Sequence, residues 1–127
     1  LRLVIAKNPS YYNAYNALGF SLADRNLRLS EAKQLIVKAL TFAPDDPFIT
    51  DSLGWVEFRL GNLNAALTHL QTAYKNRQDA EIAAHLGEVL WVLKREDDAR
   101  KIWREGLDTA PTNETLQETL QRLKPAL

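Results

Sequence analysis

Apolar and polar residues alternate along this chain with the period of an α-helix. Leu35, Ile36 and Ala39, for example, recur at the spacing that places side chains on one helix face. Asp46 followed by Pro47 is typical of an N-cap with proline at the first helical position. The pattern predicts helices over residues 11–26, 30–43, 47–60, 63–76, 80–94, 96–109 and 113–123, with further caps at Ser30 and at Thr112 or Asn113.

A Leu-Gly pair recurs along the chain, with its glycine at Gly19, Gly54 and Gly87. The glycines are 35 and 33 residues apart, which straddles the roughly 34-residue period of one kind of two-helix repeat. Because a bulky side chain would force paired helices apart, small residues at matching places predict pairs of closely packed helices. Those on the second helix of each pair are Ala32, Ala66 and Ala99, followed by Ala39, Ala73 and Gly106.

This register of small residues resembles the tetratricopeptide repeat over nearly the whole chain. The resemblance implies an all-α fold: a right-handed superhelical solenoid of helix-turn-helix units with a C-terminal capping helix. The chain is then a single domain, 1–127. Its expected parts are the tail of a preceding repeat at 1–9, repeats at 12–46, 47–79 and 80–113, and the capping helix at 114–123.

The two ends of the chain carry different patterns. Leu116, Leu120 and Leu123 form an apolar stripe opposite a polar face, as expected for the helix that caps a stacked array. Residues 1–9 instead resemble the second helix of a unit whose first helix lies upstream of Leu1. We expect this interrupted end to expose apolar side chains and to favour self-association or a partner repeat. Those side chains are Leu1, Val4, Ile5 and Tyr15.

Composition narrows the class of partner. Lysine plus arginine is 16 and aspartate plus glutamate is 16, so the formal net charge is zero. This balance gives no electrostatic reason to expect nucleic acid or an anionic membrane as partner. The apolar runs are only a few residues long, so no direct membrane insertion by this segment is expected. The absence of cysteine excludes disulfides, thiolate nucleophiles and cysteine-based zinc sites.

No residue pattern points to catalysis, a metal or a cofactor. His69 and His85 lie in different repeats without a carboxylate or histidine at metal-ligand spacing, so both are interpreted as structural. Asp45 and Asp46 belong to a helix-capping loop, and acidic residues at 96–98 open a helix where the macrodipole favours negative charge. With no phosphate-binding glycine loop and no hydrolase motif, the sequence predicts a protein that is not an enzyme.

In tetratricopeptide repeats the first helix of each unit lines a concave groove, and the aligned glycines indicate which positions would face it here. These positions combine aromatic side chains at the centre with mixed charges at the edges, which is typical of a protein-binding surface. They are Asn13, Asn16, Phe20 and Asp24 in the first repeat, Phe48, Asp51, Trp55, Phe58 and Arg59 in the second, and Glu81, Ala84, Glu88, Trp91 and Val92 in the third.

The tryptophans are the most informative of these residues. We expect Trp55 and Trp91 to be exposed on adjacent first helices and to line one pocket, the alternative being that they pack under neighbouring helices. Trp103 falls at a core-facing position of a second helix. Chaperone-tail adaptors use lysines at certain groove positions to clamp a carboxylate. The corresponding positions of this chain have no lysine, so a protein or peptide of another kind is expected. The corresponding residues here are Asn16, Asp51 and Ala84.

Three stretches narrow the resemblance further. They are NALGFSLADR in the 13–25 region, APDDPFITDSLGWVEFRLG at 43–61, and AAHLGEVLW with the following DDAR and tryptophan at 83–103. They are similar to the C-terminal repeats of large tetratricopeptide lipoproteins of Gram-negative bacteria. That resemblance implies a periplasmic scaffold, held at the outer membrane by an upstream lipid anchor, with a carboxyl-terminal processing protease or another envelope enzyme as partner. Glu57 departs from the repeat, which usually has tyrosine or leucine there, and either alters packing or adds a charged contact.

Other interpretations stay open at this point. The segment can be a cytoplasmic adaptor of the same fold. It can be the structural end-cap of a longer solenoid whose binding repeats lie upstream. It can also be the targeting arm of a catalytic domain elsewhere in a longer chain.

Overall fold

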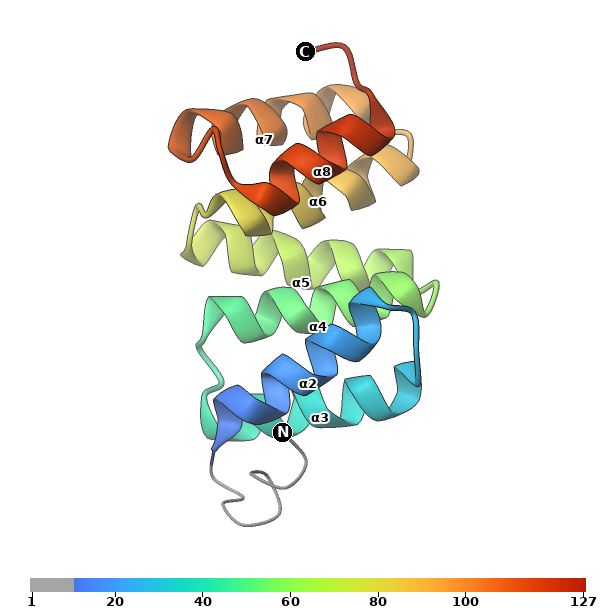
Figure 1. The fold of residues 1–127 in the computed structure, drawn as a ribbon, viewed down its shortest axis with the longest axis vertical. Helices are drawn as coiled ribbons and strands as arrows, with labels where there is room; N and C mark the ends of the chain where they lie inside the picture. The colour runs from blue at the N-terminus through green and yellow to red at the C-terminus, as the bar shows by residue number, and fades with distance from the viewer. Residues whose placement is uncertain (1–10) are drawn as a thin grey trace.

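The computed structural model describes residues 11–127, and within them the chain is all-α (Figure 1). This part of the chain forms seven helices and no strand. The predicted helices are confirmed, and no end differs from its expected position by more than two residues. The bounds are α2 Tyr12–Asp24, α3 Leu29–Phe42, α4 Pro47–Arg59, α5 Leu63–Asn76, α6 Ala80–Val92, α7 Glu96–Thr109 and α8 Glu114–Leu123.

Side-chain caps start three of these helices. The Asp46 carboxylate accepts hydrogen bonds from the first amides of α4, as predicted, and Asn113 does the same for α8. Asp79 caps α6, which the sequence reading missed. The expected cap at Ser30 is wrong, because α3 begins one residue earlier and its N-cap is Arg28 in the left-handed conformation.

Consecutive helices pair as hairpins, α2 with α3, α4 with α5 and α6 with α7. The hairpins stack along the long axis of the molecule, with the N-terminal end at the bottom of Figure 1 and the C-terminal end at the top. The first helices α2, α4 and α6 also contact one another in that order. Helix α8 continues this series, because it packs against α6 and α7 as the first helix of a further unit would.

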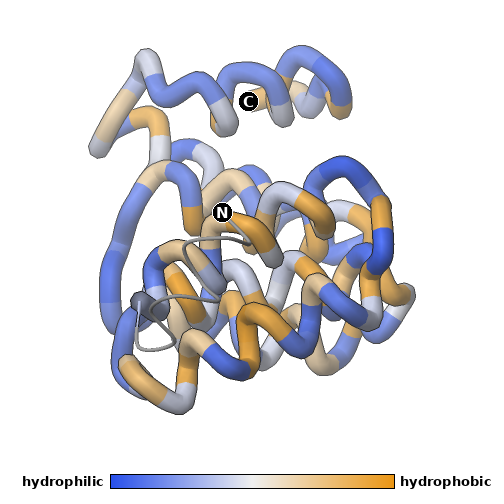
Figure 2. The backbone as a smooth tube through the Cα atoms, turned by 60° about the horizontal axis from the view of Figure 1, so that its bottom comes forward, coloured by the Kyte–Doolittle hydropathy of each residue, from blue (hydrophilic) through white to orange (hydrophobic). Residues whose placement is uncertain are grey.

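Two clusters of buried apolar residues hold the array together. The N-terminal cluster contains Ile36, Ile49 and Val56 from α3 and α4. The C-terminal cluster joins α5, α6, α7 and α8, with Trp103 as its largest fully buried side chain. Figure 2 shows apolar and polar stretches alternating along each helix, as expected when one face of each helix packs inward.

The repeated glycines lie where the two helices of each hairpin approach most closely. A Cβ added at Gly19 would lie 2.7 Å from Ile36, and one at Gly54 would lie 2.7 Å from Leu70. At Gly87 the gap is smaller still, since the added atom would meet the indole nitrogen of Trp103 at 2.1 Å. The expectation that these small residues permit close packing is therefore confirmed.

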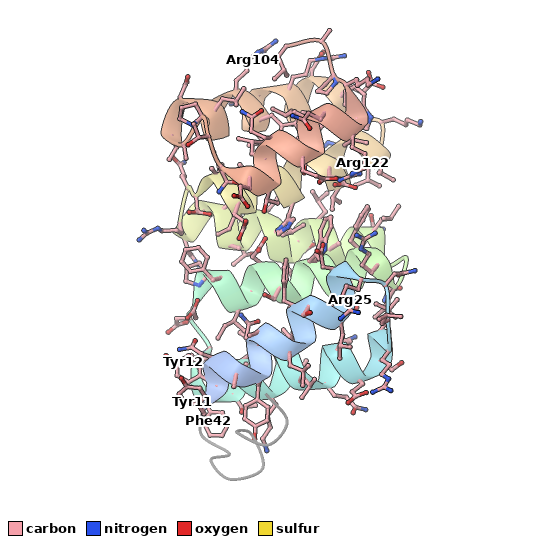
Figure 3. The ribbon with its side chains drawn as sticks, viewed as in Figure 1. Tyr11, Tyr12, Arg25, Phe42, Arg104 and Arg122 are labelled. Atoms are coloured by element: carbon pink, nitrogen blue, oxygen red, sulfur yellow. The ribbon has the colours of Figure 1, made fainter. Side chains whose placement is uncertain are left out.

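The N-terminal end of the described array differs from the expectation. Tyr15 is buried and stacks on Phe42, with ring centroids 6.4 Å apart, so the prediction that it is exposed is wrong. Tyr11 and Phe42 are the exposed aromatics at this end (Figure 3), with 50% and 44% of their surface accessible. Leu1, Val4 and Ile5 lie outside the described residues, and self-association through this end stays a prediction.

Replacing Gly87 tests how much the fold depends on these contacts. We expect Gly87→Ala to lower the free energy of unfolding by about 1–3 kcal/mol, because the new methyl group overlaps Trp103. This expected change is net of the gain of about 1 kcal/mol in helix propensity that alanine normally brings. Urea denaturation followed by circular dichroism measures the difference.

Gly106→Ala is the graded comparison, since its added atom would meet Ala83 and Leu116 at the looser distance of 3.1 Å. It should cost less than Gly87→Ala. A Gly87→Ala variant as stable as the parent chain would contradict the close-packing argument.

A candidate binding cavity between α2 and α8

A cavity of about 540 Å³ opens on the side of the array formed by the first helices. Helices α4 and α6 contribute its central residues, α2 contributes one flank and α8 the other. Its lining residues are Phe20 and Asp24 from α2, Trp55 and Arg59 from α4, His85 and Glu88 from α6, and Glu114, Thr115, Glu118, Thr119 and Arg122 from α8.

Stacked rings form the centre of the cavity. The ring of Trp55 stacks on His85 with centroids 4.3 Å apart, and Phe20 lies 5.7 Å from the same histidine. The indole N–H of Trp55 donates to the Asp24 carboxylate at 3.3 Å. Only 3% of the Trp55 surface is accessible, so the prediction that it is exposed is wrong. It lies at the floor of the cavity, with the rings of Phe58 from α4 and His85 from α6 stacked on it.

A buried ion pair lies at this floor. His85 Nδ1 is 2.9 Å and 3.0 Å from the two carboxylate oxygens of Asp51, and both residues are buried. Burial raises the pKa of the Asp51 carboxyl above its ordinary value. Burial alone lowers the pKa of His85, but attraction and hydrogen bonding to Asp51, with smaller contributions from Glu81 and Glu88, raise it overall. Asp51 lies 34 residues before His85, so no local spacing in the sequence predicted this contact, and His85 is a structural histidine, as predicted.

Arg122 holds α8 against α6. Its guanidinium donates to both oxygens of the buried Glu88 carboxylate, at 2.7 Å and 2.9 Å, and to Glu118 at 2.8 Å. These hydrogen bonds raise the pKa of Arg122 above its already high ordinary value. The Thr115 hydroxyl hydrogen-bonds the Glu81 carboxylate close by. Figure 3 shows Arg122 on the side of α8 that faces α6.

Three polar contacts between successive first helices share one sequence offset. Asp51 and His85 are 34 residues apart, and so are Glu88 and Arg122. The Thr115–Glu81 hydrogen bond has the same separation. Because the offset equals one repeat, each pair joins corresponding turns of neighbouring first helices. The cavity lining is therefore held in register by the repeat itself.

A second arginine closes the α2 flank. Arg59 donates to the backbone carbonyl of Asp24 at 3.2 Å, and its guanidinium is 3.9 Å from the carboxylate of the same residue. The guanidinium carbon also lies 5.0 Å from the centre of the Trp55 ring. Both arginines of the cavity are thus engaged with carboxylates of the chain.

The structure brings together some of the groove residues predicted from the sequence. Phe20, Asp24, Trp55, Arg59 and Glu88 line the cavity. Their role in binding stays a prediction. Asn13, exposed on α2, Asn16, half-buried on α2, Asp51, buried beside His85, and Phe58, which packs on Trp55 at 5.0 Å, do not line it. The other predicted residues outside the lining are Phe48 and Val92, which are exposed, Ala84, which is buried, and Glu81, which bonds Thr115.

The expectation that Trp91 shares a pocket with Trp55 is wrong. Trp91 packs on Trp103 of α7, with ring centroids 5.6 Å apart, and Arg100 covers it at 5.4 Å. It lies near the end of α6, where the side chain turns towards the partner helix of its own hairpin instead of the cavity. Trp103 is fully buried, as predicted, and its indole N–H donates to the carbonyl of Ala84 at 3.4 Å.

The α8 side of the cavity was missed in the sequence. The predicted groove residues include none from the capping helix, although Glu114, Thr115 and Glu118 line the cavity. A count of 34 residues onward from Glu81, His85 and Glu88 would have found this side, because it reaches Thr115, Thr119 and Arg122. A capping helix that packs as a further first helix also supplies residues to the groove.

Glu57 adds a charged contact, which was one of the two alternatives for this departure from the repeat. Its buried carboxylate lies 3.3 Å from the Lys33 ammonium and accepts a hydrogen bond from Asn62 at 3.2 Å.

Within residues 11–127, no group of three or more His, Cys, Asp or Glu side chains is arranged to hold a metal ion. None of the described helices has the length and apolar character of a bilayer span.

The stacked hairpins, the glycine contacts and the cavity on the first-helix side form the arrangement of the tetratricopeptide-repeat fold. A curated relative agrees: the chain is 51% identical over 88 residues to the TPR repeat-containing protein PA4667 of Pseudomonas aeruginosa. The match covers 69% of this chain but only 15% of that relative's length. No protein-family model matches the chain.

Solved structures share the fold at low sequence identity. The tetratricopeptide protein TTC0263 of Thermus thermophilus superposes with a TM-score of 0.81 at 22% identity, over 97% of this chain and 69% of that one. The first such domain of Spaghetti (RPAP3), bound to the HSP90 peptide SRMEEVD, gives 0.75 at 17% identity, over 89% of this chain and 92% of that one. The pilF protein of Pseudomonas aeruginosa gives 0.67 at 17% identity, over 99% and 67%.

The raised pKa of His85 predicts how stability changes with pH. The folded chain holds the histidine proton more tightly than the unfolded chain, so this stabilisation is complete below pH 6.5 and is lost as the pH rises through the folded pKa. Thermal unfolding from pH 6 to pH 9 should therefore show a falling midpoint that flattens in His85→Gln.

His69→Gln is the matched control, because it removes the other histidine and leaves the Asp51–His85 pair in place. It should keep the pH dependence of the parent chain. An unchanged dependence in His85→Gln would overturn the assignment of the effect to this pair.

Removing the Arg122 guanidinium should loosen α8. We expect Arg122→Gln to lower the free energy of unfolding by about 1–2 kcal/mol, since the buried Glu88 carboxylate loses a two-point partner that is itself partly exposed. Amide hydrogen exchange should become faster in α8 than in α4 or α5. Arg104→Gln on α7 is the control, because Arg104 forms no ion pair within residues 11–127 and points outward (Figure 3). Equal exchange in the two variants would contradict this role.

Proposed function

We propose that this tetratricopeptide-repeat segment is an interaction scaffold that binds a protein or peptide segment in the cavity between α2 and α8. The observation that carries the proposal is the composition of the cavity. A rigid aromatic centre of Trp55, His85 and Phe20 is surrounded by charged side chains at its edges. Binding sites commonly combine such an apolar centre with a few well-placed polar groups.

The rigidity of the floor supports a binding role. Trp55 is held by a hydrogen bond to Asp24 and by the stacked ring of His85, which in turn is held by Asp51. A partner therefore loses little affinity to ordering of the site, because the side chains already occupy their bound arrangement. The flanks are more exposed than the floor, since the Glu118 side chain is 61% accessible and the Asp24 side chain is 54% accessible.

The structural neighbours support the same class of function. The RPAP3 domain is bound to a peptide of HSP90, and its fold matches this chain over most of its length. The peptide of that complex is acidic, whereas the cavity here has no lysine and both of its arginines are paired with carboxylates. We therefore expect this chain to bind a partner that lacks the acidic character of that peptide.

For the cellular setting, we propose a segment of a larger periplasmic lipoprotein that brings a carboxyl-terminal processing protease or another envelope enzyme to its place of action. The resemblance of the three stretches to repeats of such lipoproteins supports this setting. Fractionation of the full-length protein, with labelling of an N-terminal lipid, tests it. A soluble cytoplasmic protein without lipid would instead favour the cytoplasmic adaptor.

Substitutions at the edge of the cavity test the binding site. We expect Phe20→Ala combined with Glu114→Arg to weaken binding at least tenfold, because truncation of an aromatic anchor typically costs about 2 kcal/mol. The probes are peptides selected from a phage-displayed random library with the parent chain as bait, and affinity is measured by calorimetry. Thermal unfolding of each variant confirms that it is folded.

The matched control places the same kinds of change on the opposite side of the array. Val37→Ala combined with Gln34→Arg alters exposed residues of α3 outside the cavity and should leave affinity unchanged. If no selected peptide distinguishes the cavity variant from this control, the cavity is not the binding site. The structural end-cap then becomes the better interpretation.

A further inference from the structure

We propose that the cavity accepts a segment with a lysine or arginine beside an apolar residue, the cationic group lying against Glu114 and Glu118 of α8. The inference rests on the proposed function and adds the chemistry of the occupant. The apolar side chain would meet Phe20 and the aromatic centre, and the cation would meet the acidic flank. The following observations carry it.

The first is the balance of charge in the cavity. Four carboxylates line it, from Asp24, Glu88, Glu114 and Glu118, but only two guanidinium groups do. The buried Asp51–His85 pair beneath the floor adds one charge of each sign when the histidine is protonated. The cavity thus has an excess of negative charge, although the chain as a whole has a formal net charge of zero. The excess is a local property of this face.

The second observation is that both arginines of the cavity are already paired. Arg122 donates two hydrogen bonds to the buried Glu88, so its charge balances that carboxylate first. Arg59 lies against Asp24 and over the ring of Trp55. Both guanidinium groups therefore already share their charge with carboxylates of the chain. An anionic occupant would therefore meet unbalanced carboxylates and no unpaired cation.

The third observation locates the excess on α8. Glu114 and Glu118 are four residues apart, so they lie on the same face of the helix. Glu114 makes no ion pair within residues 11–127, and Glu118 shares Arg122 with Glu88. Like charges at this spacing repel each other in the free protein. A lysine or arginine placed between them would relieve the repulsion and add attraction in a partly enclosed site.

The chain itself shows that the aromatic centre tolerates a guanidinium. Arg59 lies 5.0 Å from the centre of the Trp55 ring, the distance at which a cation is attracted to an indole face. The apolar contact on the α2 flank, which Asp24 and Arg59 also line, is Phe20, half-buried beside His85. A cationic residue followed or preceded by an apolar one matches this division between the α8 flank and the α2 flank.

The library selection described above also tests this inference when it is repeated with a second bait, Glu114→Gln combined with Glu118→Gln. Peptides selected on the parent chain should be enriched in lysine or arginine next to an apolar residue. Their affinity should fall about three- to tenfold on the second bait, because each lost charge pair is worth up to about 1 kcal/mol. It should also fall as the salt concentration rises.

Two controls separate local from general effects of charge. Asp97→Asn combined with Asp108→Asn removes the same number of carboxylates from exposed positions of α7, outside the cavity, and should leave affinity unchanged. Replacing the cationic residue of a selected peptide by alanine should weaken binding to the parent chain. The same peptide change should have little effect on the bait that lacks Glu114 and Glu118.

The outcomes distinguish the inference from the proposed function. Peptides that lose affinity on the Phe20→Ala, Glu114→Arg variant but have no enrichment of basic residues would overturn the cationic occupant and leave the binding cavity in place. Equal affinity for the parent chain and the Glu114→Gln, Glu118→Gln bait would also overturn the cationic occupant and leave the binding cavity in place. Peptides whose affinity is unchanged by every cavity substitution would overturn both proposals.

Discussion

The close approach of the two helices in each hairpin is the constraint on which the rest of this structure depends. Gly19, Gly54 and Gly87 leave room for one large side chain of the partner helix, and at Gly87 that side chain is the fully buried Trp103. Protein interiors are packed too densely to absorb an extra methyl group at such a point. The separation of the helices sets how the hairpins stack, and the stacking brings α2, α4, α6 and α8 to one side of the molecule.

Polar contacts between these first helices then give the shared side its character. The Asp51–His85 and Glu88–Arg122 pairs each join neighbouring helices one repeat apart. Buried pairs of this kind add little to net stability, because desolvation offsets much of the attraction. Their greater effect here is positional: one holds the ring against which Trp55 stacks, and the other holds α8 against α6. The cavity therefore has a firm centre and a defined acidic flank.

The repeat also explains why the capping helix is part of the site. Helix α8 buries Leu116 against the preceding hairpin, as a cap must, and its polar face turns towards the cavity. Packing as a further first helix makes both possible at once. The same helix thus closes the core and supplies Glu114 and Glu118, the carboxylates that we expect to select the partner.

The sequence by itself determined the helices, the pairing of helices and the close contacts at glycine, because each follows from local spacing and from one period repeated along the chain. Only the tertiary structure decided which side chains reach the cavity. Trp91 packs on Trp103, Trp55 is stacked on His85, and His85 pairs with a carboxylate 34 residues away. Those outcomes depend on the distance and rotation between neighbouring helices, which helical periodicity within one segment does not contain.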